Sequence, residues 1–416
     1  MATGTYKPLW ARCTIYWDNG QPHVLVTADV LAFARSMNQA IRRDVEAFGV
    51  DRAAFALCAT HTHNGPVLVD TLVPYIAYNL TPELMQPVYA YSSWLVSAIV
   101  QLVHDTLNAP RTPCTLHHHL ARADFSHNRE GLSYIEHDVP VLVARSLQGA
   151  PLAVLFGYGC HPVASGSQTT FDPDYPGEAV DVIEGSTGAF AQFVLGAAGD
   201  QGPTGTRGRP LRDMVGRELG VSVANAVETP GRPVSGRLRG AYREVTLPLD
   251  VATTPQGLAD ARAAYIERQR NHGVGYYRRH AEVMIEQLDK RVFDTTVPLP
   301  LQVWRFDGDP ALRIAFIGGE PASGYAVYFR ARHGGSNGVW VNGYANEVPA
   351  YIPSDELVNG GGAGHYACGW SPDQPGIAGG SMTVYGHVGK FLGRPRGTST
   401  VGVEQILIGA MTDLLA

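Results

Sequence analysis

Three histidines follow apolar segments of the chain and could together bind a metal ion. His61 and His63 come shortly after the apolar run at residues 53–59, and His161 follows a second run at residues 152–158. Short apolar runs predict buried β-strands, and the ends of neighbouring buried strands meet at one edge of a sheet. In an extended chain His61 and His63 point to the same side. The first hypothesis is a zinc site. For the pair alone, two hydrogen-bonded histidines at a strand end are the alternative.

A carboxylate follows a later strand in the same way. The apolar run at residues 312–317 ends in Gly318-Gly319-Glu320-Pro321, which places Glu320 at a junction between a strand and a helix. Three or four nitrogen and oxygen ligands leave one position at zinc for water, and the metal lowers the pKa of that water to about 7. The hydroxide formed in this way can attack a carbonyl carbon, so the pattern favours hydrolysis.

The rest of the pattern predicts the elements that would position these residues. An Asn19-Gly20 turn predicts a hairpin, and an apolar stripe from Met37 to Phe48 predicts a helix. We predict one layered α/β domain over residues 1–416, a mixed sheet with flanking helices, with a point of subdivision near residues 230–235. Strands are predicted at residues 13–17, 24–30, 53–59, 116–121, 139–144, 152–158, 190–195, 239–249, 299–306 and 312–317, and helices at residues 33–48, 211–227, 255–288 with a break at Gly273 and Gly275, and 401–415.

Composition limits the class of protein. The 416 residues are 45% hydrophobic and 17% charged, which is typical of a globular enzyme with a large core. The formal net charge is −6 and the basic residues are scattered, so nucleic-acid binding is not predicted. The five cysteines are far apart and form no Cys-x-x-Cys pair, which argues against a disulfide framework and favours a reducing, cytoplasmic location. They are Cys13, Cys58, Cys114, Cys160 and Cys368.

No transmembrane segment is predicted. The most apolar long stretch, at residues 88–107, contains Ser92, Gln101, His104 and Asp105, and its apolar part is too short to span a bilayer. We interpret it as a core helix rather than as an element on a membrane surface. The N-terminal residues lack the apolar centre of a secretory signal.

Several short motifs, taken in order, resemble the catalytic domain of the neutral (non-lysosomal) ceramidases. The similarity extends from about Leu9 to Tyr351, and its strength lies in the order and spacing of the motifs. They are Thr60-His61-Thr62-His63-Asn64-Gly65-Pro66, Asn128-Arg129, His161-Pro162, Gly196-Ala197-Ala198-Gly199-Asp200, Gly319-Glu320 and Tyr351.

The resemblance implies one catalytic Zn²⁺ and hydrolysis of an amide bond in a lipid-like substrate. It also implies that His63 and Arg129 lie near the substrate carbonyl, where they could stabilise an oxyanion. Tyr344 competes with Tyr351 for the last ligand position, and we favour Tyr351. The implied zinc ligands are His61, His161, Glu320 and Tyr351.

The chain departs from the ceramidase pattern in three respects. The family carries a serine within Gly-Asp-x-Ser-Pro, whereas this chain has Gly202 at that position, so metal-activated water would carry the attack. Gly202 also lies in a turn that we expect to use the backbone freedom of glycine. The second downstream tyrosine of the family falls at residues 360–362, which are glycines here. We further expect no immunoglobulin-like C-terminal domain and a start later than the family's, which leaves open whether the native N-terminus is complete.

We therefore predict a zinc-dependent amidohydrolase that cleaves an N-acyl or other hydrophobic small molecule. One alternative is a zinc esterase or lactonase with the same site. Another is a non-catalytic binding protein on a decayed ceramidase-like scaffold, which the missing serine suggests. The expected partner is a small molecule with an apolar portion, and homo-oligomer formation is left open.

Other polar and aromatic residues have simpler interpretations. His117-His118-His119 would alternate between the faces of a strand, so we expect a surface strand and no metal site. Asp172, Asp174 and Glu178 are expected to be acids near a helix start. Asp200 is expected in a turn, with a contact to the site as the alternative. For five aromatic residues we expect core packing rather than a substrate groove. These are Tyr75, Tyr78, Tyr89, Tyr91 and Trp94.

Overall fold

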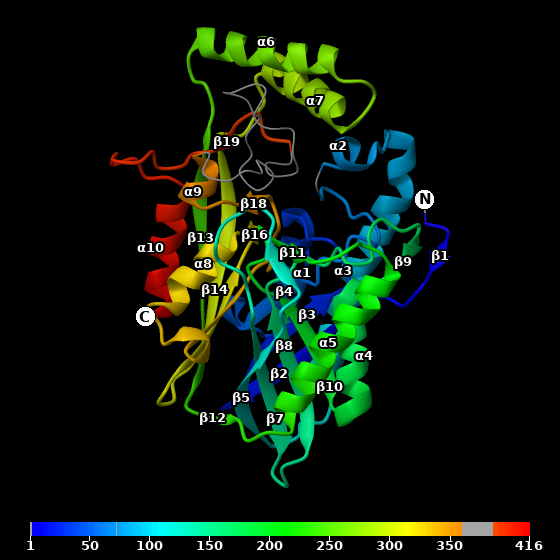
Figure 1. Cartoon of the computed structure of the whole chain (residues 1–416), viewed down its shortest axis with the longest axis vertical. Helices are drawn as coiled ribbons and strands as arrows, with labels where there is room; N and C mark the ends of the chain where they lie inside the picture. The colour runs from blue at the N-terminus through cyan, green and yellow to red at the C-terminus, as the bar shows by residue number, and fades with distance from the viewer. Residues whose placement is uncertain (1, 72, 360–385) are drawn as a thin grey trace.

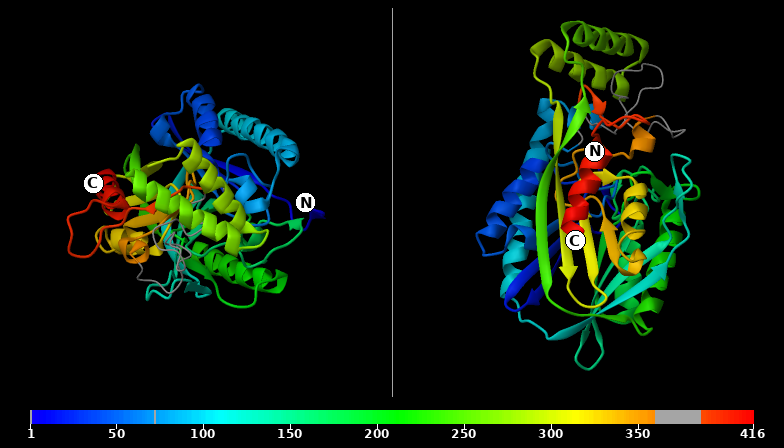
Figure 2. Two further views of the ribbon diagram at one scale, coloured as in Figure 1. Left: turned by 90° about the horizontal axis from the view of Figure 1, so that it is seen from above. Right: turned by 90° about the vertical axis from the view of Figure 1, so that its left-hand side faces the viewer.

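Two five-stranded sheets pack face to face and carry helices on their outer faces (Figures 1 and 2). This architecture comes from a computed structural model that describes residues 2–71, 73–359 and 386–416. The strand orders are β10-β8-β7-β5-β12 and β17-β15-β14-β13-β19. The predicted layered α/β fold, with mixed sheets and flanking helices, is confirmed.

The first sheet is covered by helices α4 (Asp174–Thr187) and α5 (Arg209–Val227). Apolar residues on the inner faces of both helices form one cluster with the sheet, including Ile183, Val215 and Phe193. Strand β8 pairs in parallel with β10, so their carboxyl ends lie at the same edge. The strands are β5 (Cys114–Arg122), β7 (Asp138–Ser146), β8 (Pro151–Tyr158), β10 (Phe190–Leu195) and β12 (Arg232–Val234).

The second sheet is covered by α8 (Ser323–Arg330) and α10 (Val403–Leu415). Strands β13 and β14 form a long antiparallel pair, and β15 pairs in parallel with β17 at the edge. The strands are β13 (Leu238–Asp250), β14 (Thr296–Phe306), β15 (Leu312–Ile317), β17 (Val339–Asn342) and β19 (Lys390–Phe391).

A three-stranded sheet, β2-β3-β4, lies beside the other two and is covered by α1 and α3. The predicted hairpin at Asn19-Gly20 joins β2 to β3, and β4 pairs in parallel with β3. All five residues of β4 are buried, because the strand has packed neighbours on both faces. The elements are β2 (Ala11–Asp18), β3 (Gln21–Ala28), β4 (Phe55–Ala59), α1 (Arg35–Glu46) and α3 (Gln86–Asn108).

The remaining helices and several two- or three-residue strands complete the described part of the chain. Helices α6 and α7 form a hairpin at the top of Figure 1, and α7 contacts α2. The helices are α2 (Pro74–Tyr78), α6 (Pro255–Asn271), α7 (Tyr276–Lys290) and α9 (Asp355–Val358), with 3₁₀ turns η1 (Arg52–Ala54), η2 (Pro82–Met85) and η3 (Gly335–Asn337). The short strands are β1 (Gly4–Thr5), β6 (Ser126–Asn128), β9 (Thr170–Phe171), β11 (Gln201–Pro203), β16 (Glu320–Pro321) and β18 (Tyr351–Ile352).

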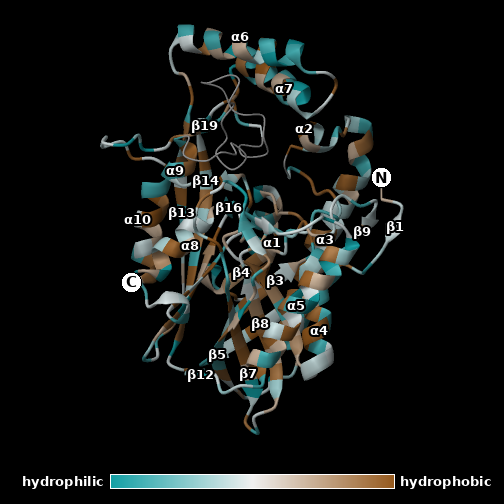
Figure 3. Ribbon diagram, viewed as in Figure 1, coloured by the Kyte–Doolittle hydropathy of each residue, from teal (hydrophilic) through white to brown (hydrophobic). Residues whose placement is uncertain are grey.

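The core between the two large sheets contains residues from both halves of the chain. Leu142 and Leu155 of the first sheet join Trp304, Phe316 and Trp340 of the second in one buried cluster. Each such side chain stabilises the fold by roughly 2 kcal/mol through removal of apolar surface from water. Figure 3 shows these apolar segments along the strands. The single domain over residues 1–416 stays a prediction, but this cluster crosses the boundary suggested near residues 230–235.

Most predicted elements are confirmed, including the helix break at Gly273 and Gly275 between α6 and α7. Phe48 is an exception, because α1 ends at Glu46 and the Phe48 side chain is 40% exposed. No helix in the described ranges is long and apolar enough to cross a membrane. The glycines at residues 360–362 and Cys368 lie outside the described residues.

Two expectations about side-chain burial are wrong. His118 and His119 are buried rather than on a surface strand, because the inter-sheet core covers one face of β5 and α5 covers the other. Four of the five aromatic residues assigned to core packing are instead more than one-third exposed, since α2 and α3 turn these positions away from the sheets. The four are Tyr75, Tyr78, Tyr89 and Trp94.

Candidate metal centre

Four strands end at the same place and deliver polar side chains to it. His61 follows β4, His161 follows β8, Glu320 follows β15, and Tyr344 follows β17. Backbone bridges between Cys58 and Ala345, and between Gly196 and Asn342, join the three sheets at this end. The convergence predicted from the apolar runs is therefore present, as expected for the carboxyl ends of strands in α/β folds.

The three histidines and Glu320 point at a common centre. The Nε2 atom of His161 lies 3.0 Å from Nε2 of His61 and 3.1 Å from Nε2 of His63. Oε2 of Glu320 lies 3.4 Å from Nε2 of His61 and 3.8 Å from Nε2 of His161. His61, His161 and Glu320 are buried, whereas His63 is exposed on its outer side. The three histidine rings form a group able to hold a metal ion.

Carbonyl groups orient two of the rings so that their lone pairs meet. Nδ1 of His61 lies 2.5 Å from the carbonyl oxygen of Leu31, and the shortest contact of Nδ1 of His161 is to the carbonyl of Ala198, at 3.2 Å. A ring that donates from Nδ1 to a carbonyl presents an unprotonated Nε2 on its other side. In this tautomer both Nε2 atoms, 3.0 Å apart, are free to bind one cation.

The spacing of these atoms fits a zinc ion. Ligands 2.0–2.1 Å from a tetrahedral zinc are separated from one another by about 3.3 Å. The two Nε2 separations around His161 and the Glu320–His61 separation, 3.0, 3.1 and 3.4 Å, are close to that value. The donor set of imidazole nitrogens and one carboxylate oxygen also matches the preference of zinc over hard cations such as Mg²⁺.

The backbone at His61 is strained. His61 has a φ of +67°, in the left-handed region that residues with a Cβ atom rarely adopt. Its N–H donates to the carbonyl of Val30 at 3.0 Å, and the Leu31 carbonyl accepts from its ring. Strain of this kind costs roughly 1–3 kcal/mol and is often found at functional sites. The segment at residues 30–31 therefore holds both the backbone and the ring of His61.

Both candidate tyrosines lie at the centre, in different positions. Tyr351 is opposite Glu320 in the β16–β18 pair, and its ring stacks parallel to that of His161 at 6.2 Å. The hydroxyl of Tyr344 lies 3.4 Å from Nδ1 of His161. Burial, the charge of Glu320 and a hydrogen bond to that carboxylate hold the pKa of Tyr344 well above its usual value. The sequence preference for Tyr351 as a ligand stays a prediction.

Arg129 and His63 both contact His161, at 3.4 Å from its Nδ1 and 3.1 Å from its Nε2. An Nη atom of Arg129 donates to the carbonyl of Gly199 at 2.5 Å and lies 3.4 Å from the hydroxyl of Tyr351. Burial, followed by the neighbouring His61 ring and the positive charges of Arg129 and Arg207, holds the pKa of His63 well below its usual value. Both residues assigned to the substrate carbonyl are therefore next to the candidate metal ligands.

Comparison with known proteins identifies the fold. No protein-family model and no curated protein sequence matches the chain. A solved ceramidase complexed with C2 superposes with a TM-score of 0.64 at 17% identity, over 92% of this chain and 67% of that one. Neutral ceramidase from Pseudomonas aeruginosa superposes with a TM-score of 0.59 at 18% identity, over 85% of this chain and 64% of its own length. The fold is ceramidase-like.

Gly202 is the point at which this ceramidase-like chain lacks the serine of the family pattern. Gly202 lies in β11 and pairs with His127 of β6. A Cβ atom built at this position would lie 2.9 Å from Cδ and 3.2 Å from Cγ of Arg129. The φ of Gly202 is outside the left-handed region, so the expected need for backbone freedom is wrong. Gly202 instead makes room for the side chain of Arg129.

Asp200 supports the site through buried hydrogen bonds. Its carboxylate is buried and accepts hydrogen bonds from Nδ2 of Asn128 at 2.9 Å and from the backbone and hydroxyl of Ser323 at 2.7 and 2.9 Å. The backbone N–H of Arg129 donates to the carbonyl of Asp200 at 2.7 Å. Asp200 thus links the segment that carries Arg129 to the start of α8, just after Glu320. Asp200 lies in a turn, as expected.

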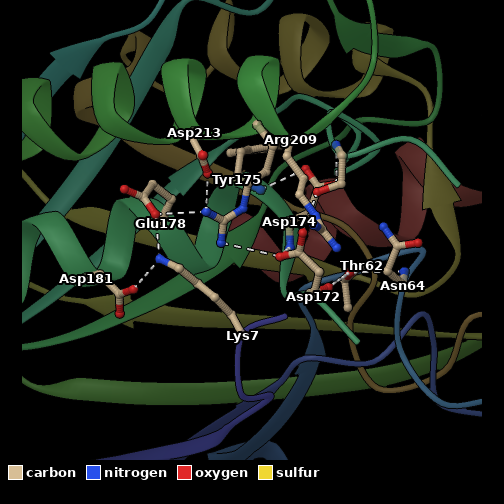
Figure 4. Close-up of polar contacts among 12 residues, drawn as sticks. Lys7, Thr62, Asn64, Asp172, Asp174, Tyr175, Glu178, Asp181, Arg209 and Asp213 are labelled. Atoms are coloured by element: carbon tan, nitrogen blue, oxygen red, sulfur yellow. Dashed lines mark hydrogen bonds and ion pairs between the residues drawn. The ribbon is translucent and has the colours of Figure 1, made fainter. Parts of the chain in front are cut away.

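A second buried network holds the loop that carries His61 and His63 (Figure 4). The Thr62 hydroxyl donates to the carbonyl of Asp172 at 2.5 Å, and the Asp172 N–H donates to the carbonyl of Asn64 at 3.1 Å. The Asp172 carboxylate accepts from the Ser165 hydroxyl at 2.7 Å and lies 3.3 Å from the guanidinium of Arg212 on α5. Helix α5 therefore fixes the loop through Asp172.

The acids after His161 differ from the expectation. Asp174 is the first residue of α4, as an acid at a helix start should be, but it is fully buried with a φ of +59°. Its carboxylate accepts from the backbone N–H groups of Ala164 and Ser165. Burial raises the pKa of Asp174 to about 6. Asp172 lies before the helix, so the first-turn explanation is wrong for it.

Sequence reasoning missed one charged residue beside the site. Arg207 lies in the loop between β11 and α5 and acts electrostatically on His63. The signal in the sequence was weak, because a single arginine between Gly205 and Gly208 is common in surface loops.

Proposed function

We propose that this chain is a zinc-dependent hydrolase that cleaves the amide bond of an N-acyl or other hydrophobic small molecule. The observation that carries the proposal is the meeting of the Nε2 atoms of His61 and His161, at 3.0 Å from each other, beside the carboxylate of Glu320. These are ligand types and separations that a zinc ion at this point would require. The ceramidase-like fold supports amide hydrolysis as the reaction.

Four residues would hold the zinc: His61, His161, Glu320 and Tyr351. His63 is a third imidazole within reach of the same centre, 3.1 Å from His161. Zinc bound there would supply a Lewis acid and would lower the pKa of water at the site to about 7. The carbonyls of Leu31 and Ala198 would keep the first two rings in the required orientation.

The residues around the centre would orient and stabilise the reacting amide. Arg129 is held by the Gly199 carbonyl and would place positive charge where the carbonyl oxygen becomes negative. His63 faces the same space from its exposed side. Gly202 has no hydroxyl, so the attacking oxygen comes from water rather than from a serine at that position. The new C–O bond would form first and leave the carbonyl oxygen negative; the amide C–N bond would then break, and the leaving nitrogen would take up a proton from the attacking water.

Exposed aromatic side chains would contact an apolar part of the substrate. Tyr78 of α2 lies near enough to Glu320 that its pKa is raised, first by burial of the hydroxyl and then by the carboxylate charge. The residue as a whole is 36% exposed, so part of it is available to a substrate. Tyr75, Tyr89 and Trp94 are exposed on α2 and α3 as well.

Metal-replete protein should be assayed against a panel of N-acyl amides and matched esters of equal chain length. We expect release of the fatty acid from the amides, dependent on zinc and lost in His161→Ala. The control is His104→Ala, which removes an exposed histidine on α3. Faster turnover of the esters would favour the esterase or lactonase. Absence of stoichiometric zinc together with absence of turnover would contradict a hydrolase and favour a binding protein.

A further inference from the structure

Arg207 is held beside the candidate active site by a short anchored loop. The loop between β11 and α5 begins where the Thr204 N–H donates to the carbonyl of Phe125 at 2.7 Å. It ends where the Gly208 N–H donates to the carbonyl of Ala164 at 2.8 Å. Gly205 has a φ of +117°, a conformation that favours glycine. Arg207 is thus presented from a fixed backbone rather than from a free tail.

Packing places this loop next to His63. A Cβ atom built on Gly166 would lie 3.4 Å from Cβ of Arg207, so the two segments are in contact. The carbonyl of Gly166 accepts from Nδ2 of Asn64 at 2.9 Å, and Asn64 is the residue after His63. The guanidinium charge of Arg207 is also among the causes that lower the pKa of His63.

The charge of Arg207 is not neutralised within the described ranges. Arg207 is exposed and makes no hydrogen bond or ion pair there. The neighbouring arginines are different: Arg209 donates to Thr170 and lies over the ring of Tyr6, and Arg212 pairs with acids. The partial positive charge at the start of α5 adds to the potential at Arg207.

The acidic residues near the site do not oppose this positive charge. Asp172, Asp174 and Asp200 are fully buried, and each accepts several hydrogen bonds from its surroundings. The exposed side of the centre therefore carries Arg207, on the loop that packs against Gly166 and, through it, against the residue after His63. A neutral amphiphile would leave this charge without a partner.

We propose that the substrate carries a carboxylate that binds Arg207 while the scissile amide lies at the metal centre, which makes it an N-acyl amino acid. This inference rests on the proposed function. An arginine guanidinium matches a carboxylate with two parallel hydrogen bonds. The reaction would convert the N-acyl amino acid and one water into a carboxylic acid and a free amino acid. Water supplies the oxygen to the acyl carbon and a proton to the leaving nitrogen.

A matched substrate pair tests this assignment. N-dodecanoylglycine carries the carboxylate, N-dodecanoyl-2-methoxyethylamine does not, and both release dodecanoic acid, which mass spectrometry measures. We expect Arg207→Gln to lower kcat/KM for the glycine substrate by about tenfold, the effect of one charge-assisted contact near solvent. The loss should fall on KM rather than kcat, because the carboxylate is distant from the reacting bond. Turnover of the methoxyethylamine substrate should not change.

Two further variants complete the design. Arg207→Lys keeps the charge without the two-pronged geometry and should retain part of the activity toward N-dodecanoylglycine. Arg43→Gln removes an arginine whose side chain is 73% exposed on α1, and this variant should hydrolyse both substrates as the wild type does. Added salt should raise KM for the glycine substrate only.

Failure of the inference and failure of the proposed function give different results. Equal hydrolysis of both substrates by wild type and Arg207→Gln would overturn the carboxylate assignment and leave the hydrolase intact. If neither substrate is hydrolysed, calorimetry with the non-hydrolysable dodecylsulfonylglycine decides. Weaker binding to Arg207→Gln than to the wild type would then support the carboxylate site. Equal binding to both proteins, or no binding to either, would overturn it.

Discussion

Two groups of three histidines in this chain show how differently the same residue type can be used. His61 and His63 lie on one loop and His161 on another about 100 residues later, and the Nε2 atom of His161 lies within 3.1 Å of Nε2 of both other rings. His117, His118 and His119 are consecutive on β5, so they alternate between faces of the sheet. Convergence in space, and not closeness in sequence, makes the first group a candidate metal centre.

The surroundings of the two groups differ as well. Carbonyl oxygens orient His61 and His161 through Nδ1, which leaves Nε2 available to a metal. Both ring nitrogens of His118, in contrast, have no hydrogen-bond partner among the residues the structure describes. Burial, with smaller effects from Arg232 and His119, lowers the pKa of His118 to about 4. Burial likewise lowers the pKa of His119 to about 4, so these two β5 histidines are neutral and buried. The two groups should therefore respond differently to mutation.

The largest expected effect follows from His161→Ala. Wild type should hold about one zinc per chain, and this substitution should remove it, because His161 touches both other rings. His61→Ala should do the same, whereas His118→Gln should keep the metal. Elemental analysis by mass spectrometry after dialysis measures the content. Full zinc occupancy in a folded His161→Ala protein would show that the ligands are wrongly assigned.

Glu320→Gln should weaken metal binding and abolish turnover without unfolding the protein, since a neutral amide is a poor zinc ligand. The matched control is Glu286→Gln, which changes a carboxylate exposed on α7. Metal titration and circular dichroism would be compared for both variants. Retained activity in Glu320→Gln would leave this residue with a structural role at the start of α8.

Gly202→Ser should lower activity, roughly tenfold or more. The Cβ atom of the serine would lie only 2.9 Å from Cδ of Arg129, so the Arg129 side chain would have to move. Rapid-mixing kinetics of the wild type should show no burst of leaving group, and water labelled with ¹⁸O should place one label in the acid product.

A burst or a covalent acyl adduct would indicate another nucleophile. Thr204 would be the first suspect, because it is exposed and lies 3.5 Å from Nδ1 of His127. Ser165 is less suited, since it is buried and donates to Asp172. A large gain in activity on restoring serine would instead indicate a disabled relative.

The smallest effect concerns stability and the β5 group. His118 has a lowered pKa in the folded protein and one near 6.5 when unfolded. The free energy of unfolding that depends on a neutral His118 is therefore fully present above pH 6.5. It is lost as the pH falls toward 4, on the order of 3 kcal/mol in all. Urea unfolding of His118→Leu should show a shallower loss over this range. Equal slopes for wild type and variant would contradict a buried neutral His118.

Much of the fold and the centre of the site followed from local pattern. Apolar runs of five to eight residues identified strands such as β4 and β8, because burial on both faces leaves little room for polar residues. Glycine and proline after those runs marked the strand ends where His61, His161 and Glu320 lie. The family resemblance added Arg129 and Tyr351, which the structure brings to the same place.

Exposure could not be predicted in the same way. Trp94 and Tyr89 are on an amphipathic helix whose orientation depends on how α3 packs against α1 and the small sheet. His118 and His119 are buried because a second sheet and α5 cover β5, and neither neighbour is close in sequence. Burial of a given side chain is thus a property of long-range packing.

The sequence by itself determined which residue types stand at the strand ends, because the hydrophobic pattern sets both the strands and their termini. Only the tertiary structure decided that the Nε2 atoms of His61 and His161 face each other, since this depends on contacts of the two rings with the distant carbonyls of Leu31 and Ala198. It also decided that Arg129 fills the space left by Gly202, and that Arg207 lies beside His63. Contacts between residues far apart in the chain follow from how whole elements pack, and no local pattern encodes them.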